Sequence, residues 1–254
     1  MKTPLLKIDI LSIYKNSLGD QVPLPSRMAY CTPDTCKAIM SISRDLSEKG
    51  GKLILSDLFR SYDMQAQAYN DYASGKKEAY SPPPGGSFHE AGRAFDLDLS
   101  KIKISLAKFW DLAAKYGVVP IISKPLLQSE AWHFDCRGSH QLVYQYYAEG
   151  KGHGMSPYTA AATSAILSIG TQVDRFEIRQ KQAAIQSCLI RLGKEIGDID
   201  GYIGCRTQKA LTDFEIEYDY NNIDEITMKI ENLVQQKFPE EFTVPQSTDD
   251  NGIK

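Results

Sequence analysis

Residues 87–96 read SFHEAGRAFD, and this short stretch determines how the first half of the chain has to fold. It places His89 and Asp96 seven residues apart. Side chains at that separation on a flat strand point to opposite faces of a sheet. The two can meet at one metal ion only if the chain bends between them, and Gly92 permits such a bend. A catalytic zinc site needs a third protein ligand, so this pair alone does not establish one.

A third ligand is found in residues 129–135, SEAWHFD, which supply His133 with Glu130 three positions before it. Two neutral imidazoles and one carboxylate leave Zn²⁺ with a net positive charge and an open position for water. Under these conditions the pKa of the bound water falls to about 7. Glu130 can then take the proton from that water and pass it to the leaving amine. We therefore expect His89, Asp96 and His133 to bind one Zn²⁺ per chain, with the Glu130-activated zinc water as nucleophile.

The two stretches resemble the zinc signatures S-x-H-x-x-G-x-A-x-D and E-x-W-H of the D-Ala-D-Ala carboxypeptidase/dipeptidase family of zinc peptidases, whose members cut peptidoglycan stem peptides. Residues 60–65, RSYDMQ, resemble a third motif of that family, R-S-x-x-x-Q. The resemblance implies metal binding by His89, Asp96 and His133, catalysis by Glu130 and Arg60, and substrate contacts from Ser87, Arg60 and Gln65.

The chemistry of two kinds of side chain supports these roles. The guanidinium of Arg60 can grip a peptide carboxylate in two places and so position the scissile bond over the metal. Asp98 and Asp135 flank the expected ligands and are candidates for orienting the imidazoles through hydrogen bonds.

Apolar residues recur at helical spacing in three segments of the last third of the chain, which predicts three helices. This part resembles the small three-helix peptidoglycan-binding domain, whose pattern runs L-x-x-x-G, then I-D-G-x-x-G, then T-x-x-A-x-x-x-F. The matching residues are Leu189, Gly193, Ile199, Asp200, Gly201, Gly204, Thr207, Ala210 and Phe214. Such a domain would hold the enzyme at its polymeric substrate and raise the local concentration there.

Short strand-like segments alternate with helical ones in the first block, which favours an α+β fold. We expect a small antiparallel sheet with helices in a zinc peptidase domain at residues 1–155, and an all-α three-helix bundle at residues 171–242. Residues 156–170 have the alanine, serine and threonine content of a linker, although residues 160–169 could form a short helix, and residues 243–254 have the composition of a flexible tail.

The bulk properties exclude several classes of protein. A net charge of −3 over 254 residues gives no support for nucleic-acid binding. No stretch approaches the roughly 18 apolar residues of a membrane span, so we expect no membrane insertion. Five cysteines are too few for a disulfide scaffold, and whether Cys188 and Cys205 pair stays open. We expect a monomer, although the sequence does not determine the oligomeric state.

Three functions remain open at this level. The first is a D,D-carboxypeptidase acting on peptidoglycan stem peptides. The second is an endopeptidase of the wall, for example at the L-Ala–D-Glu bond, as in an endolysin of a phage or a secreted effector. The third is a non-catalytic wall-binding protein. All three act in the periplasm or cell wall. Residues 1–20 do not read as a signal peptide, so we expect release by a phage, a specialised secretion system, or a leader that has been trimmed.

Overall fold

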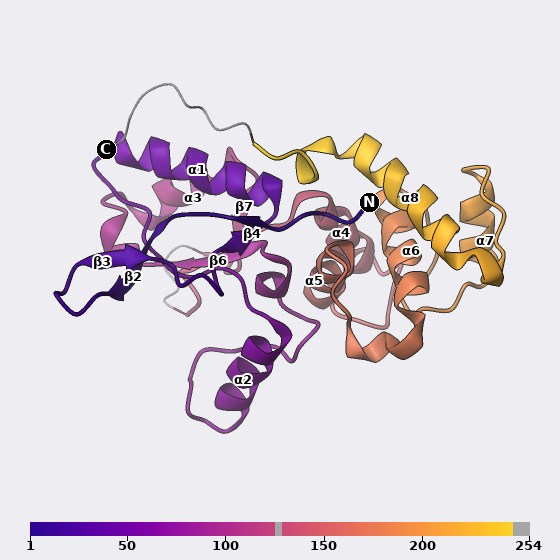
Figure 1. Cartoon of the computed structure of the whole chain (residues 1–254), viewed down its shortest axis with the longest axis horizontal. Coiled ribbons are helices and arrows are strands. Elements are labelled where there is room, and N and C mark those ends of the chain that lie inside the picture. Colours follow the sequence, from indigo (N-terminus) through magenta and orange to yellow (C-terminus); the bar gives the residue numbers. More distant parts are fainter. Residues whose placement is uncertain (125–128, 246–254) are drawn as a thin grey trace.

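The computed structural model describes residues 1–124 and 129–245 and contains a sheet-bearing half and a helical half (Figure 1). The strands are β1 (Leu6–Lys7), β2 (Leu11–Lys15), β3 (Gln21–Pro23), β4 (Tyr30–Cys31), β5 (Leu55–Asp57), β6 (Ala94–Leu97), β7 (Val118–Pro120) and β8 (His133–Cys136). The helices are α1 (Pro33–Ser47), α2 (Tyr62–Ala73), α3 (Leu106–Ala114), α4 (Gln141–Ala148), α5 (Pro157–Ser168), α6 (Gln180–Arg191), α7 (Cys205–Thr212) and α8 (Ile223–Lys237). The predicted α+β class is confirmed.

The main sheet has six strands in the order β3-β2-β5-β6-β8-β7. All neighbouring strands are antiparallel except β2 and β5, which run parallel, so the expected antiparallel sheet is in fact mixed. β1 and β4 form a separate two-stranded antiparallel ladder. In the centre of the main sheet, β6 pairs with β8 so that Asp96 lies opposite His133. This register brings two side chains that are 37 residues apart in the sequence to the same place.

One face of the sheet is covered by α1 and α3 (Figure 1). Phe95 and Phe134 point into this core, where their rings stack at 6.0 Å, and Phe109 of α3 meets Phe134 edge-on. Because side chains alternate along a strand, Asp96 and His133 must point to the other face. The apolar residues of β6 and β8 therefore pack in the core, and Asp96 and His133 face the site on the opposite side of the sheet.

The bend expected at Gly92 is present. Residues Phe88–Ala91 form a single 3₁₀ turn that ends at Gly92, whose φ of 63° lies in the left-handed region. A β-carbon at Gly92 would lie 2.9 Å from the Cα of Cys31, so both the conformation and the space favour glycine. The turn lets His89 and Asp96 face the same point despite their odd spacing in the sequence.

The helical half begins earlier than expected and contains more than three helices. The three predicted helices correspond to α6, α7 and α8, but α4 and α5 share one hydrophobic core with them. Residues 156–170, expected to be a linker, contain α5, in which Ala160, Ala161 and Ala162 have no exposed surface. The alanine, serine and threonine content that suggested a linker instead allows close packing of this helix. Of the expected tail at 243–254, only residues 243–245 lie within the described part of the chain.

The two halves also share this core. It includes Phe88, Ala91 and Ala94 from the segment that carries the predicted ligands, together with α4 and α5. Ala94 faces the helical half, whereas its neighbour Phe95 faces α1 and α3. β6 therefore lies between two hydrophobic cores, and the helical half covers part of the face that bears the site.

A buried cluster of charged side chains forms a second contact between the two halves. Glu241, which follows α8, is fully buried, and its carboxylate accepts hydrogen bonds from Arg191 Nη2 at 2.5 Å and from the backbone N–H of Ser139 at 2.7 Å. The same carboxylate lies 3.3 Å from Nη2 of Arg93, within the segment of residues 87–96. Arg93 also donates to Asp34 of α1 at 2.6 Å. Two buried arginines and two carboxylates thus compensate each other across the interface.

No helix within the described residues combines the length and the apolar character needed to cross a membrane. The five cysteines are free in the structure: Cys188 is buried in α6, Cys205 is exposed at the start of α7, and the two do not pair.

Replacing Glu241 by alanine should lower the free energy of unfolding by about 3–5 kcal/mol, because it removes a carboxylate shared by two buried arginines. Urea denaturation followed by circular dichroism measures this change. Glu240→Ala is the matched control, since Glu240 is the adjacent, exposed glutamate. A loss for Glu241→Ala no larger than that for Glu240→Ala would show that the cluster does not stabilise the fold.

Candidate metal centre

His89, Asp96 and His133 converge on one point in the structure. His89 Nε2 lies 3.3 Å from His133 Nδ1 and 3.4 Å from Asp96 Oδ1, and His133 Nδ1 lies 2.9 Å from the same oxygen. These three residues form a potential metal-binding group within the described part of the chain. The bend at Gly92 supplies His89, and the register of β6 with β8 supplies the other two.

The spacing of the three atoms fits a tetrahedral zinc ion. Bonds of about 2.0–2.1 Å at tetrahedral angles place ligand atoms roughly 3.3–3.4 Å apart. The observed separations of 2.9, 3.3 and 3.4 Å need only small adjustments to match this value. Two imidazoles and one carboxylate are also a donor set of the type found in catalytic zinc sites. The residues present therefore fit Zn²⁺.

Hydrogen bonds set the tautomer of each histidine for metal binding. The Nδ1–H of His89 donates to the backbone carbonyl oxygen of Leu58 at 2.7 Å, which leaves Nε2 free to bind a cation. The Nε2–H of His133 donates to Asp135 Oδ1 at 3.0 Å, which leaves Nδ1 free. Burial acts to raise the pKa of Asp96, but the two imidazoles hold the pKa well below its usual range, so this ligand is ionised.

Asp135 occupies the orienting position that the sequence suggested for it, and Asp98 does not. The second carboxylate oxygen of Asp135 accepts from Arg137 Nε at 3.1 Å and Nη2 at 3.0 Å. The hydroxyl of Tyr158, on α5, donates to the first oxygen at 3.3 Å. Asp98 instead accepts hydrogen bonds from Ser100 and caps a short 3₁₀ turn. Asp135, the carboxylate that orients His133, is thus itself fixed by hydrogen bonds from Arg137 and Tyr158.

Glu130 lies in the turn before β8 and lines the same groove as His89, Asp96 and His133. Its φ of 57° is in the left-handed region, which is uncommon for a residue with a side chain and is found more often at functional sites. The backbone N–H of His133 donates to the carbonyl oxygen of Glu130 at 3.1 Å and closes this turn. Burial raises the pKa of Glu130, which makes its carboxylate a better proton acceptor.

The three expected substrate contacts have different environments. Arg60 lines the groove, but Asp57 Oδ2 accepts from both its Nε and Nη2 at 2.6 Å, and Nη2 lies 3.6 Å from Asp96. Ser87 also lines the groove, and its Oγ accepts the backbone N–H of His89 at 3.3 Å. Gln65 is fully buried and does not line the groove. Its side chain accepts from Arg60 Nη1 at 3.2 Å and donates to Pro82 O at 2.6 Å.

The groove around these residues has a volume of about 580 Å³. Tyr144 of α4, together with Ser156, Tyr158 and Thr159 at the start of α5, forms part of its wall. Sequence analysis named none of them as a site residue: Ser156, Tyr158 and Thr159 lie in the segment assigned to a linker, and Tyr144 lies near the end of the expected peptidase domain. No motif marked them, since their position depends on how the helical half packs against the sheet.

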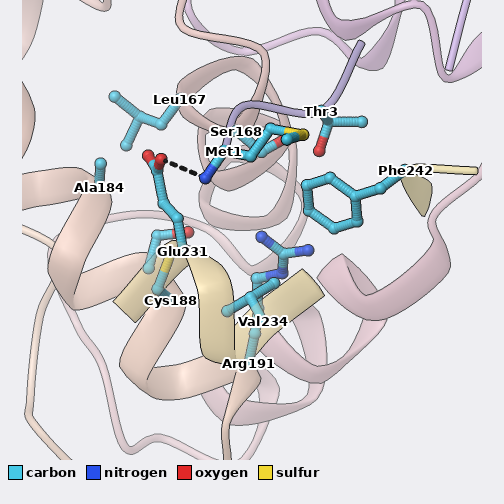
Figure 2. A pocket seen from close by; sticks show the side chains of 11 residues that line it. Met1, Thr3, Leu167, Ser168, Ala184, Cys188, Arg191, Glu231, Val234 and Phe242 are labelled. Atoms are coloured by element: carbon cyan, nitrogen blue, oxygen red, sulfur yellow. Dashed lines mark ion pairs between the residues drawn. The ribbon is translucent and has the colours of Figure 1, made fainter. Parts of the chain in front are cut away.

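A second cavity lies between the first residues of the chain and helices α5, α6 and α8 (Figure 2). Figure 2 shows the α-amino group of Met1 beside Glu231, to which it is 3.2 Å distant. The volume of this cavity is about 10 Å³, which holds no more than a water molecule. It therefore does not compete with the groove as a site for substrate.

Comparison with known proteins finds a family match for the part of the chain that contains these residues. Residues 29–139 match the family model of D-alanyl-D-alanine carboxypeptidase (VanY). The matched segment contains the three ligands and Glu130 and ends before α4. The match confirms the predicted family resemblance of the first block and the predicted class of enzyme. It does not extend to the expected peptidoglycan-binding domain.

Several solved structures resemble the chain. The LD-carboxypeptidase LdcB is 19% identical, with a TM-score of 0.40 over 52% of this chain and 66% of that chain. DacB from Streptococcus pneumoniae D39 is 26% identical, with a TM-score of 0.36 over 58% and 89%. The vancomycin resistance D,D-pentapeptidase VanY in complex with Zn(II) is 13% identical, with a TM-score of 0.34 over 59% and 88%. All three TM-scores lie below 0.5. A search among curated proteins finds no match.

Replacing Asp96 by alanine should lower the affinity for Zn²⁺ by more than about 100-fold, because loss of a ligand exceeds the effect of losing an orienting residue. Competition with a chromogenic chelator measures the affinity. Asp98→Ala is the matched control, since Asp98 is two residues away and its side chain accepts hydrogen bonds from Ser100 instead of facing the candidate ligands. Equal zinc affinities of the two variants would refute the assignment of Asp96 as a ligand.

Proposed function

We propose that this protein, which carries a D-alanyl-D-alanine carboxypeptidase domain of the VanY family in residues 29–139, is a zinc-dependent peptidase that removes the terminal D-Ala of peptidoglycan stem peptides. The observation that carries this proposal is the convergence of His89, Asp96 and His133 within 3.4 Å of one another in a groove that also contains Glu130. Its place of action is the bacterial cell wall.

The residues of the chain supply distinct parts of the reaction. A bound Zn²⁺ would act as a Lewis acid on the scissile carbonyl and lower the pKa of water. Glu130 accepts the proton of the attacking water and returns it to the nitrogen of the leaving amino acid. Its raised pKa suits both steps, since the carboxylate is more basic and the carboxylic acid remains strong enough to protonate an amine.

Two further residues position the substrate in this proposal. The Arg60 guanidinium is held by Asp57 and Gln65, so its charge is fixed beside Asp96 without movement during the reaction. Such a preorganised cation stabilises negative charge that develops on the scissile carbonyl oxygen. Ser87 caps the turn that carries His89, and its place in the groove wall allows its hydroxyl to contact the peptide backbone. Gln65 acts through Arg60, because it is buried behind it.

We also propose that residues 171–242 help to attach the enzyme to peptidoglycan. The loop that carries the I-D-G-x-x-G pattern is well ordered: Gln186 accepts hydrogen bonds from the backbone N–H groups of Asp200 and Gly201 at 3.0 and 2.7 Å. Tyr202, within this loop, is 61% exposed and stacks on Arg179, whose guanidinium lies 4.3 Å from its ring centre. An exposed, rigidly held aromatic ring is a suitable contact for a polymer surface.

Replacing Glu130 by glutamine should lower the rate of hydrolysis by roughly 10²–10⁴-fold, because the amide cannot accept the proton of water. The zinc content should stay at one ion per chain, because Glu130 is not a ligand. Mass spectrometry of purified muropeptides, before and after incubation, measures the products. Ser129→Ala, at the exposed neighbouring position, is the control and should retain activity.

The same experiment separates the competing functions. Loss of the mass of one alanine from the stem identifies a carboxypeptidase, whereas two fragments produced by internal cleavage identify an endopeptidase such as an endolysin. If the zinc-loaded wild-type protein leaves every muropeptide intact, the enzymatic proposal fails and a wall-binding protein remains.

Replacing Tyr202 by alanine should reduce co-sedimentation of the full chain with purified peptidoglycan at least about threefold, if this ring contacts the polymer. The experiment is best done with Glu130→Gln also present, so that the polymer is not degraded. Tyr220→Ala is the control, because Tyr220 is similarly exposed, at 64%, but lies outside the I-D-G-x-x-G loop. Equal sedimentation of both variants and the parent would contradict the proposed attachment.

A further inference from the structure

The positive charges that line the groove differ in whether the protein already compensates them. Three cationic side chains contribute to its wall: Arg60, Lys77 and Arg137. Arg60 is paired with Asp57 at 2.6 Å, and Arg137 is paired with Asp135 at 3.0 Å. Lys77 has no ion pair and no side-chain hydrogen bond with any residue in the described ranges 1–124 and 129–245. Among the described residues, its ammonium group is therefore the cation of the groove wall that no carboxylate contacts directly, and its charge acts on Glu130 in the same groove.

The position of Lys77 is determined by the turn that follows α2. Gly75, with a φ of 75°, reverses the chain after the helix, and the backbone N–H of Lys77 donates to the carbonyl oxygen of Asp71 at 3.0 Å. Ala79 and Tyr80, which follow Glu78 in the same loop, also line the groove. Lys77 is half-buried, whereas the side chain of its neighbour Lys76 is 74% exposed and pairs with Asp71 at 3.7 Å. Of these two adjacent lysines, only Lys77 belongs to the groove wall.

Other parts of the groove wall carry no unpaired positive charge among the described residues. The α4–α5 side presents Tyr144, Tyr158 and Thr159, whose rings and hydroxyls carry no charge, and the nearby Arg137 is neutralised by Asp135. Arg60, which the sequence suggested as the group that grips a peptide carboxylate, uses its Nε and Nη2 on Asp57. The loop after α2 thus contributes an unpaired ammonium group to the groove wall, whereas α4 and the start of α5 contribute uncharged rings and hydroxyls.

We infer that Lys77 binds a carboxylate of the peptide substrate and so determines in which direction the peptide lies across the metal site. This inference rests on the proposed function and adds a specificity-determining residue to it. A peptide of the proposed class offers two sources of carboxylate, the free C-terminus and an internal acidic residue. A charge-assisted hydrogen bond to either in a partly desolvated groove is stronger than a neutral one. The uncharged rings of Tyr144 and Tyr158 would then contact the uncharged part of the peptide.

The test measures binding, so that it gives an answer whether or not a bond is cleaved. The zinc-loaded protein with Glu130→Gln is titrated calorimetrically with a pentapeptide that ends in D-Ala-D-Ala and contains one internal acidic residue, as the free acid and as the C-terminal amide. Lys77→Ala, Lys77→Arg and the control Lys76→Ala are compared in this background. We expect Lys77→Ala to weaken binding of the free acid by at least about tenfold, equivalent to about 1.4 kcal/mol, while Lys77→Arg and Lys76→Ala change it less than about threefold.

The pattern across the two peptides identifies the carboxylate. A loss confined to the free acid assigns Lys77 to the C-terminus, and an equal loss for acid and amide assigns it to the internal acidic residue. Unchanged affinities in Lys77→Ala, an equal loss in Lys76→Ala, or absence of binding by the parent protein would each overturn the inference. Cleavage by the wild-type chain is assayed in parallel: Lys77-dependent binding without any cleavage would refute the proposed hydrolase but not the role of Lys77.

Discussion

The antiparallel register of β6 with β8 is the constraint on which the site depends. It places Asp96 opposite His133, and it does so because Phe95 and Phe134 must enter the core beneath α1 and α3. A slip of one residue would place a polar side chain of one strand opposite a phenylalanine of the other, so one of the two strands would have to turn its polar side chain into that core. The burial of apolar side chains on one face therefore determines where Asp96 and His133 lie on the polar face.

Around this register the site is made rigid by groups that do not bind metal. The backbone carbonyl of Leu58 orients His89, and Asp135 orients His133 while held by Arg137 and Tyr158. Such partners fix the tautomer that presents the correct nitrogen. Tyr158 belongs to α5, outside the segment that matches the carboxypeptidase family, so the helical half takes part in orienting a ligand.

The contact made by Tyr158 bears on how the C-terminal half is attached to the rest of the chain. A tethered binding module would be joined to the enzyme by a flexible connection, whereas α5 is a buried helix and Glu241 places a carboxylate between arginines from both halves. An attachment surface on α6–α8 would thus have a fixed orientation relative to the groove. For a polymeric substrate, fixed geometry restricts which bonds can reach the metal site when the surface is engaged.

The local sequence determined the identity of the site. The types and order of His89, Asp96, Glu130 and His133 specify a cation-binding, proton-accepting chemistry, because few other side chains can perform it. The need for glycine at position 92 was also evident, since only a bend could bring His89 and Asp96 together, and the helices α6, α7 and α8 followed from the spacing of their apolar residues.

Tertiary structure decided what depends on contacts between distant segments. Alanine, serine and threonine are compatible with both a linker and a tightly packed helix, so only the surrounding core shows that α5 is buried. Whether Arg60 is free or engaged depends on Asp57 and Gln65, and whether Lys77 faces the groove depends on the turn after α2. The sequence shows which residues carry a charge, but whether that charge is paired depends on which residues the fold brings next to it.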